Sequence, residues 1–168
     1  MHQYPADTFP ALRLSAPLSG CFLVSPLLSL DLDTTSYIEN RNADLLSISV
    51  IRDWGEDLFK GSQFVNEKQN GKGWGMALSG DKGWWSHLGR IVKRVYLVGG
   101  GEELFRDHII EFGARLKNAD GVDVSVYINM EEAHDGTFMD FETGASPSRS
   151  TIRLGDWVVE SLDLSNQE

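Results

Sequence analysis

The chain has 168 residues, 41% of them apolar and 10% aromatic, which is enough to bury the core of about one domain. Its net charge of -10, from twenty-five acidic and fifteen basic residues, excludes the basic surface that binds nucleic acid or an anionic membrane. No apolar run approaches the roughly 18 residues that a membrane span needs.

Residues 1–17 form the first segment and predict an irregular lead-in. They contain three of the five prolines and show no sustained periodicity. A signal peptide would show a positively charged region followed by an apolar stretch, and this segment lacks that arrangement. We therefore expect no export signal in this chain and a cytoplasmic location.

A short apolar run, residues 18–26 (LSGCFLVSP), predicts the first strand. It is nearly continuous in apolar residues and ends at a proline, which is typical of a strand buried on both faces of a parallel sheet. The run contains Cys21, the single cysteine, which cannot form a disulfide within the chain. We interpret Cys21 as a small core residue and not as a nucleophile.

Residues 36–60 predict an amphipathic helix or a pair of helices, and residues 61–83 an irregular surface segment rich in Gly, Lys, Asn and Trp. Together they indicate a helical and irregular insert over residues 36–88. The roughly helical apolar stripe consists of Leu45, Ile48, Ile51, Leu58 and Phe59. The tryptophans at 74, 84 and 85 could line a substrate pocket or pack in the core, and core packing is the favoured role.

The clearest pattern lies in residues 90–163. A strand is predicted over 92–98 (VKRVYLV), then a turn at Gly99-Gly100-Gly101, a helix over 102–118 and a second strand over 122–130. The apolar face of this helix consists of Phe105, Ile109, Phe112 and Leu116. Gly121 suits a helix exit with positive φ. Such a β–α–β unit has parallel strands and a right-handed crossover.

The chain is predicted to end with a loop over residues 131–148 and a helix over 150–162. The apolar stripe of that helix consists of Leu154, Trp157, Val158 and Leu162. The expected fold class is therefore α/β, with a mostly parallel sheet and flanking helices.

His134 follows the carboxyl end of a predicted parallel strand, the edge where open α/β sheets carry their sites. The alternative is a solvated histidine in an acidic loop. Glu102 and Glu103 follow the neighbouring strand at the start of the predicted helix, where the helix dipole favours a carboxylate. The alternative there is an ordinary first-turn acid. A carboxylate that orients an imidazole would be two-thirds of a nucleophile–His–acid triad.

Two other kinds of site are disfavoured. The loop after the strand 92–98 lacks the G-x-G-x-x-G spacing and the P-loop lysine, and its two acids would repel a phosphate. A metal site would have to use Glu131, Glu132, His134 and Asp135, which show no established ligand spacing. We therefore expect neither a cofactor nor a metal.

Several short motifs occur in an order and spacing that resemble the hormone-sensitive-lipase-like esterase group of the α/β-hydrolase family, its fungal members in particular. The similarity covers residues 19–162, which correspond to the C-terminal half of such a domain. The motifs are Gly20-Cys21-Phe22-Leu23-Val24-Ser25-Pro26, Ser36-Tyr37-x-x-Asn40, the stretch Asp81 to His87 with Trp84-Trp85, and Glu103-Leu104-Phe105-Arg106-Asp107 followed about thirty residues later by His134.

This resemblance implies a carboxylic ester hydrolase in which His134 is the general base and Glu103 the catalytic acid, with Glu in place of Asp. The family's nucleophile elbow, G-x-S-x-G, and its His-Gly-Gly oxyanion loop do not occur in the sequence. Ser19 and Ser79 lie beside glycines but lack the elbow pattern. We therefore expect residues 18–168 to be the C-terminal portion of a truncated domain, nearly inactive alone.

Two hypotheses remain open. In the first, the chain is a truncated hydrolase whose completed form would act on a small-molecule ester. In the second, it is an inactive remnant that binds a small apolar ligand or a protein partner. The strand 18–24 would then present an unpaired apolar edge, through which the chain could associate with itself.

Overall fold

The computed structural model describes residues 14–60, 76–80 and 82–165. Within them, one sheet contains three strands in the order β1 (Cys21–Val24), β2 (Arg94–Gly100) and β3 (Asp123–Asn129). Both pairings are parallel, with Leu23 opposite Leu97 and Leu97 opposite Val126. The predicted α/β class with a parallel sheet is thus confirmed, and the first strand is shorter than the predicted 18–26.

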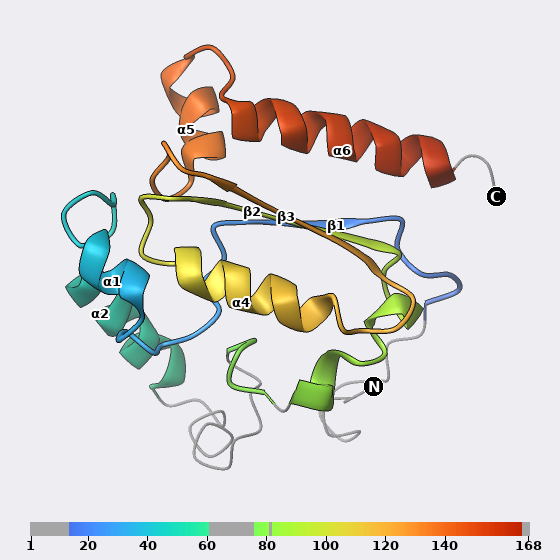
Figure 1. Cartoon of the computed structure of the whole chain (residues 1–168), viewed down its shortest axis with the longest axis horizontal. Helices are drawn as coiled ribbons and strands as arrows, with labels where there is room; N and C mark the ends of the chain where they lie inside the picture. Colours follow the sequence, from blue (N-terminus) through green and yellow to red (C-terminus); the bar gives the residue numbers. More distant parts are fainter. Residues whose placement is uncertain (1–13, 61–75, 81, 166–168) are drawn as a thin grey trace.

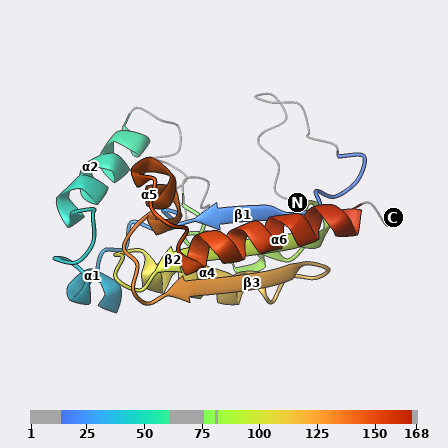
Figure 2. The same cartoon turned by 90° about the horizontal axis from the view of Figure 1, so that it is seen from above.

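Helices surround this sheet. They are α1 (Thr35–Glu39), α2 (Ile48–Phe59), α4 (Arg106–Leu116), α5 (Gly136–Thr143) and α6 (Arg149–Ser165), with short 3-10 turns at Lys82–Trp85 and Leu88–Arg90. Helix α4 covers one face of the sheet and α6 the other (Figure 1). All three strands point the same way, and α1, α2 and α5 lie beyond their carboxyl ends (Figure 2).

The main core lies between the sheet and α4. The four residues predicted as the apolar face of this helix are all buried, namely Phe105, Ile109, Phe112 and Leu116. They pack with Val95 and Leu97 of β2. Trp85 joins this core and meets Phe112 edge to face, with ring centroids 5.1 Å apart, so its predicted packing role is confirmed. Trp74 lies outside the described residues.

A smaller core lies between the sheet and α6. Tyr96 stacks on Trp157 with ring centroids 5.6 Å apart, and the guanidinium of Arg94 lies 5.2 Å from the same indole ring. Leu154 and Val158 pack against this cluster as predicted. Leu162 does not, because it lies on the solvent side of α6.

Residues 36–60 were predicted to form one amphipathic helix or a pair, and the structure has a pair, α1 and α2. Ile51 is buried and Ile48 packs against the core, whereas Leu45 and Leu58 are largely exposed. The side chain of Phe59 lies outside the described part, as do most of the residues in the predicted irregular segment 61–83 and all but four of the lead-in 1–17.

The glycine turn predicted at 99–101 is wrong in part, because Gly99 and Gly100 belong to β2. These positions are glycine because other groups approach the backbone closely. A Cβ on Gly100 would overlap the carbonyl oxygens of Glu132 and Ala133, and one on Gly101 would lie 2.5 Å from Met130 Cα. The loop after β3 therefore lies directly against the end of β2.

The predicted start of the central helix is also wrong. Helix α4 begins at Arg106, and residues 102–105 form turns before it. Glu103 is therefore not a first-turn residue, and the argument from the helix dipole does not apply to it. The chain turns here because the Glu103 side chain enters the core while Asn40 binds its carbonyl oxygen.

The predicted loop over 131–148 contains a helix, α5. Its apolar residues Phe138, Met139 and Phe141 are all substantially exposed, so no buried stripe marks the helix in the sequence. Left-handed backbone at Asp135 and Gly144 bounds it, with φ of 56° and 65°. Asp140 then accepts the N–H of Ser148 and joins α5 to the start of α6.

β1 forms one edge of the sheet within the described residues. Phe22 and Leu18 are about half exposed there, 47% and 51% respectively. Cys21 has no disulfide partner and packs against the main core, and burial raises the pKa of its thiol, as expected of an inert cysteine. None of the described helices is long and apolar enough to cross a membrane.

Candidate active site

Glu103 follows the carboxyl end of β2 and is completely buried. Its side chain turns back toward the strand, since a Cβ on Gly99 would overlap one of its carboxylate oxygens. A carboxylate in such a position has lost its hydration, so burial raises the pKa of Glu103. Contacts with His134 and Ser25 oppose this rise and do not cancel it.

His134 follows the carboxyl end of β3, the neighbouring strand, and meets this carboxylate. Nδ1 of His134 lies 3.5 Å from Oε2 of Glu103, an ion-pair contact somewhat longer than a typical hydrogen bond. The histidine side chain is only 15% exposed, and the ring of Phe105 stands edge-on to it with centroids 5.2 Å apart. The interpretation as a freely solvated histidine therefore does not hold.

The pKa of His134 reflects two opposing influences. Burial is the largest single effect and lowers it. The contact with Glu103 and the negative charges of Asp135, Glu103 and Asp44 together outweigh burial, so the pKa is raised. The surroundings of this imidazole thus favour its protonated form.

The second nitrogen of His134 faces another acid. Nε2 lies 3.4 Å from Oδ2 of Asp135, which is 38% exposed. Asp135 adopts left-handed backbone with φ of 56°, and its N–H donates to Oγ of Ser25 at 3.1 Å. Ser25 has positive φ as well, 41°, immediately after β1. The imidazole thus has a carboxylate at each nitrogen.

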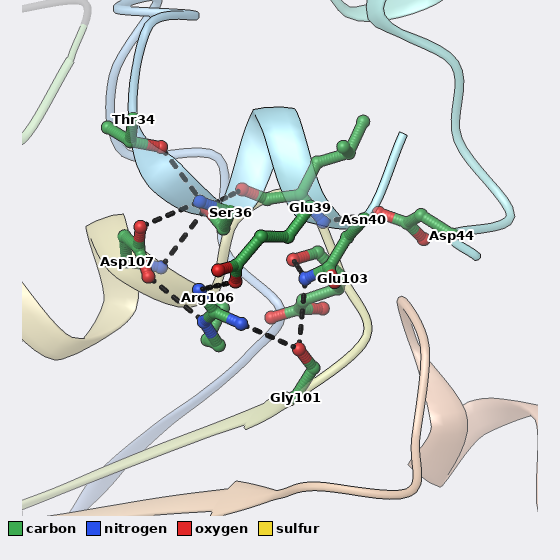
Figure 3. A network of polar contacts seen from close by, with 10 residues as sticks. Thr34, Ser36, Glu39, Asn40, Asp44, Gly101, Glu103, Arg106 and Asp107 are labelled. Atoms are coloured by element: carbon green, nitrogen blue, oxygen red, sulfur yellow. Dashed lines mark hydrogen bonds and ion pairs between the residues drawn. The ribbon is translucent and has the colours of Figure 1, made fainter. Parts of the chain in front are cut away.

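The loop that carries Glu103 is held from the other side by α1 (Figure 3). Nδ2 of Asn40 donates to the carbonyl oxygens of Gly101 and Glu103, at 2.9 and 2.8 Å. Oγ of Ser36 donates to the carbonyl oxygen of Leu104 at 2.6 Å. Ser36 and Asn40 are buried, so these bonds satisfy carbonyl groups that water does not reach.

Charged groups complete this anchoring at the start of α4. Asp107 accepts the N–H of Ser36 at 2.7 Å and pairs with Arg106, which also reaches Glu39 at 2.9 Å. Arg106 donates in addition to the carbonyl oxygen of Gly101 at 3.3 Å. Figure 3 shows these groups converging on the turn before α4. The Ser36, Asn40, Arg106 and Asp107 motifs therefore have a structural role: they fix the acid loop.

Asp44 and Ser25 also contribute to the site, and sequence reasoning did not identify either as functional. Asp44 accepts the N–H of Leu104 at 2.6 Å and the N–H of His134 at 3.2 Å. Ser36, Asn40 and Asp44 recur every four residues within a stretch interpreted as amphipathic, where Ser36 and Asn40 were noted as part of a family motif and Asp44 was not. That four-residue polar spacing was the available signal in the sequence.

The two serines that the sequence disfavoured as nucleophiles do not lie at this site. Ser19 precedes β1 and therefore lies near the amino ends of the strands, whereas His134 lies at their carboxyl ends. Ser79 follows Leu78, whose carbonyl oxygen binds Arg115 at the far end of α4. In the described part of the chain, no serine hydroxyl makes a hydrogen bond to His134.

Glu131 and Glu132 do not join His134 and Asp135 around a common centre. Glu132 instead accepts from the side chain of Asn129, and Glu131 is exposed. Among the described residues, no group of three or more His, Cys, Asp or Glu side chains could hold a metal ion.

No protein-family model and no curated protein matches this sequence.

Proposed function

We propose that this chain supplies the general base and the acid of a carboxylic ester hydrolase of the α/β-hydrolase type. The observation that carries the proposal is the contact between the buried Glu103 carboxylate and Nδ1 of His134, at 3.5 Å, with one residue at the end of each of two adjacent parallel strands. Buried carboxylates beside an imidazole are the usual means of orienting a catalytic histidine.

In the proposed reaction, Nε2 of His134 accepts the proton of a serine hydroxyl while the serine oxygen attacks the ester carbonyl. The imidazolium that forms is stabilised by Glu103, which remains ionised. His134 then returns the proton to the leaving alcohol, and the same two steps with water release the acid. Glu103 thus holds the tautomer with the proton on Nδ1, which leaves Nε2 free as a base.

The surroundings of His134 set a pH requirement for this role. Because its pKa is raised, the imidazole loses its proton at higher pH than an ordinary histidine. Only the neutral form can act as a base, so activity should rise with pH through that raised pKa. The contact of Nε2 with Asp135 must also open before a serine hydroxyl can take its place.

The nucleophile is the part of this mechanism that the sequence lacks, because it contains no G-x-S-x-G motif. We propose that polypeptide outside these 168 residues carries the serine and the oxyanion hole. Reading the coding DNA upstream of Met1 for an in-frame G-x-S-x-G tests this directly. If that longer protein is made, His134→Ala should reduce p-nitrophenyl acetate hydrolysis by about 10⁴-fold or more.

The 168-residue chain should itself hydrolyse p-nitrophenyl acetate no faster than background. Losing the attacking oxygen and the oxyanion donors removes two effects that are each worth orders of magnitude in rate. Turnover by this chain that His134→Ala abolishes would overturn the statement that the nucleophile is missing, while supporting the histidine's role.

A second candidate function is a non-catalytic binding module. The edge strand β1 favours it, because it ends the sheet on one side within the described residues and Phe22 and Leu18 are about half exposed there. In that case the purified chain should associate with itself or with a partner. A stable monomer in light scattering, together with hydrolytic activity of the longer protein, would exclude this alternative.

A further inference from the structure

Asp44 lies between α1 and α2 and binds both loops of the candidate site through one carboxylate. Oδ2 accepts the N–H of Leu104 at 2.6 Å, and Oδ1 accepts the N–H of His134 at 3.2 Å. Leu104 directly follows Glu103 in the chain. The two hydrogen bonds therefore end next to the acid on one side and at the histidine itself on the other.

We infer that Asp44 is a positioning residue, which holds the Glu103 loop and the His134 loop at the separation that lets carboxylate and imidazole meet. The catalytic purpose of this positioning rests on the proposed function. The structural statement, that Asp44 sets the contact between Glu103 and His134, does not depend on any reaction and can be tested without one.

A carboxylate suits this bridge better than any neutral side chain. Both of its oxygens accept, so it can satisfy two N–H groups that belong to different loops. An asparagine has one accepting oxygen and one amide that only donates, so it would leave one loop unbound. Hydrogen bonds to an ionised group are also about twice as strong as neutral ones.

The four-residue spacing of Ser36, Asn40 and Asp44 separates two tasks. Ser36 and Asn40 bind carbonyl oxygens of the acid loop alone. Asp44 binds N–H groups, and it is the member of the three that also reaches the histidine loop. Its negative charge further raises the pKa of His134. Asp44 therefore acts on the position of the imidazole and on its protonation.

The experiment compares Asp44→Asn with two matched variants in the full 168-residue chain. Asp107→Asn also weakens the acid loop, but its hydrogen bonds run to Ser36 and Arg106. Asp57→Asn removes the same charge from an exposed site on α2. The imidazole pKa of His134 is measured by NMR titration, with its signal assigned by loss in His134→Gln, and amide exchange is measured at Leu104 and His134.

Asp44→Asn should lower the pKa of His134 and reduce amide protection at Leu104 or His134 by roughly tenfold or more, the value of a charge-assisted hydrogen bond. Asp57→Asn should leave the pKa of His134 where it is in the unmodified chain, and Asp107→Asn, which keeps both hydrogen bonds of Asp44, should lower it less than Asp44→Asn does. An unchanged pKa in Asp44→Asn, or an equal fall in either control, would overturn the inference. None of these readouts needs ester hydrolysis, so a failure of the inference about Asp44 can be distinguished from a failure of the proposed function.

The unmodified chain provides a second test in case Asp44→Asn does not fold. The NMR signal of the Asp44 carboxyl carbon reports the protonation of this carboxylate in a pH titration. Protonation removes both charge-assisted bonds. The amide signals of Leu104 and His134 should show a transition with the same midpoint as this protonation. If either amide lacks this transition, Asp44 does not bridge the two loops.

Discussion

The two loops of the candidate site are held in different ways. The acid loop, residues 101–107, is bound by side chains from α1, by a charged pair at the start of α4 and by Asp44, and its carboxylate is completely buried. The histidine loop, residues 130–136, receives fewer bonds and carries a partly exposed imidazole. The acid is thus fixed, while the histidine retains freedom to exchange partners at Nε2.

Breaking the anchoring of the acid loop should have the largest effect. In Asn40→Ala, the carbonyl oxygens of Gly101 and Glu103 lose a buried donor, which should lower the free energy of unfolding by roughly 2–4 kcal/mol. Urea denaturation measures this loss.

Asn118→Ala is the matched control for Asn40→Ala. Nδ2 of Asn118 donates to the carbonyl oxygen of Ala114, but this contact is exposed. Its removal should change the free energy of unfolding by about 0.5 kcal/mol or less. Equal losses in the two variants would mean that the acid loop is not specially held.

The contact between the two loops should be the next most sensitive feature. In Gly100→Ala, the new methyl group meets the backbone of Glu132 and Ala133, which cannot rotate away as a side chain would. We expect a loss of about 1–3 kcal/mol in the free energy of unfolding. Gly155→Ala in α6 has no atom within 4 Å of the new Cβ and should instead stabilise the chain by about 0.5–1 kcal/mol. Thermal unfolding would show the opposite signs.

Glu103→Gln sharpens the comparison by removing the charge of the fixed acid without changing its size. The pKa of His134 should fall, because the contact with Glu103 is the first influence that raises it against burial. NMR titration of the imidazole measures this. Glu102→Gln, in the exposed neighbour of Glu103, should leave the pKa of His134 unchanged.

Glu103→Gln should also flatten the dependence of the free energy of unfolding on pH. A buried carboxyl with a raised pKa keeps its proton in the folded state to higher pH than in the unfolded chain, so its ionisation destabilises the fold as pH rises past 4.5. His134, also with a raised pKa, contributes stability that is full below 6.5 and is lost as pH rises through the folded value. Stability that rises with pH across this window would contradict both directions.

The smallest effect is expected at Ser25, which supports the histidine loop. Ser25→Ala loses the acceptor for the N–H of Asp135 and keeps a Cβ at φ of 41°, so about 1 kcal/mol of stability should be lost. Ser25→Gly loses the same bond but relieves the left-handed strain, by roughly 1 kcal/mol, and should stay close to the unmodified chain. Equal losses in the two variants would mean that Ser25 stores no strain.

The sequence allowed the β–α–β unit to be predicted, because buried strands and the Phe105 to Leu116 stripe are strong local patterns. It also pointed to His134 and to Glu102 and Glu103, since the ends of adjacent parallel strands lie at one edge of a sheet. The choice of Glu103 between the two acids came from the resemblance of residues 103–107 to the esterase motif. Helix α5 was missed because its apolar residues are exposed. The strand character of Gly99 and Gly100 was missed because it depends on the distant backbone of Glu132.

The role of the residues that hold the acid loop could be recognised only from the fold. Asn40 binds Gly101 and Glu103, and Asp44 binds Leu104 and His134, which lie far along the chain from both. A polar residue gives no local sign of a distant backbone partner. The four-residue spacing of Ser36, Asn40 and Asp44 was visible in the sequence, but the backbone groups that these side chains bind were not.

The order of the strands also has a consequence for how the chain folds. β2 and β3 are joined by α4 alone, so their pairing forms from a compact, contiguous stretch. β1 reaches its partner only after the long segment from Ser25 to Lys93 has closed, and that closure has an entropic cost. We expect the β2–α4–β3 unit to assemble first and β1 to join late. Substitutions in β1 should therefore speed unfolding more than they slow folding.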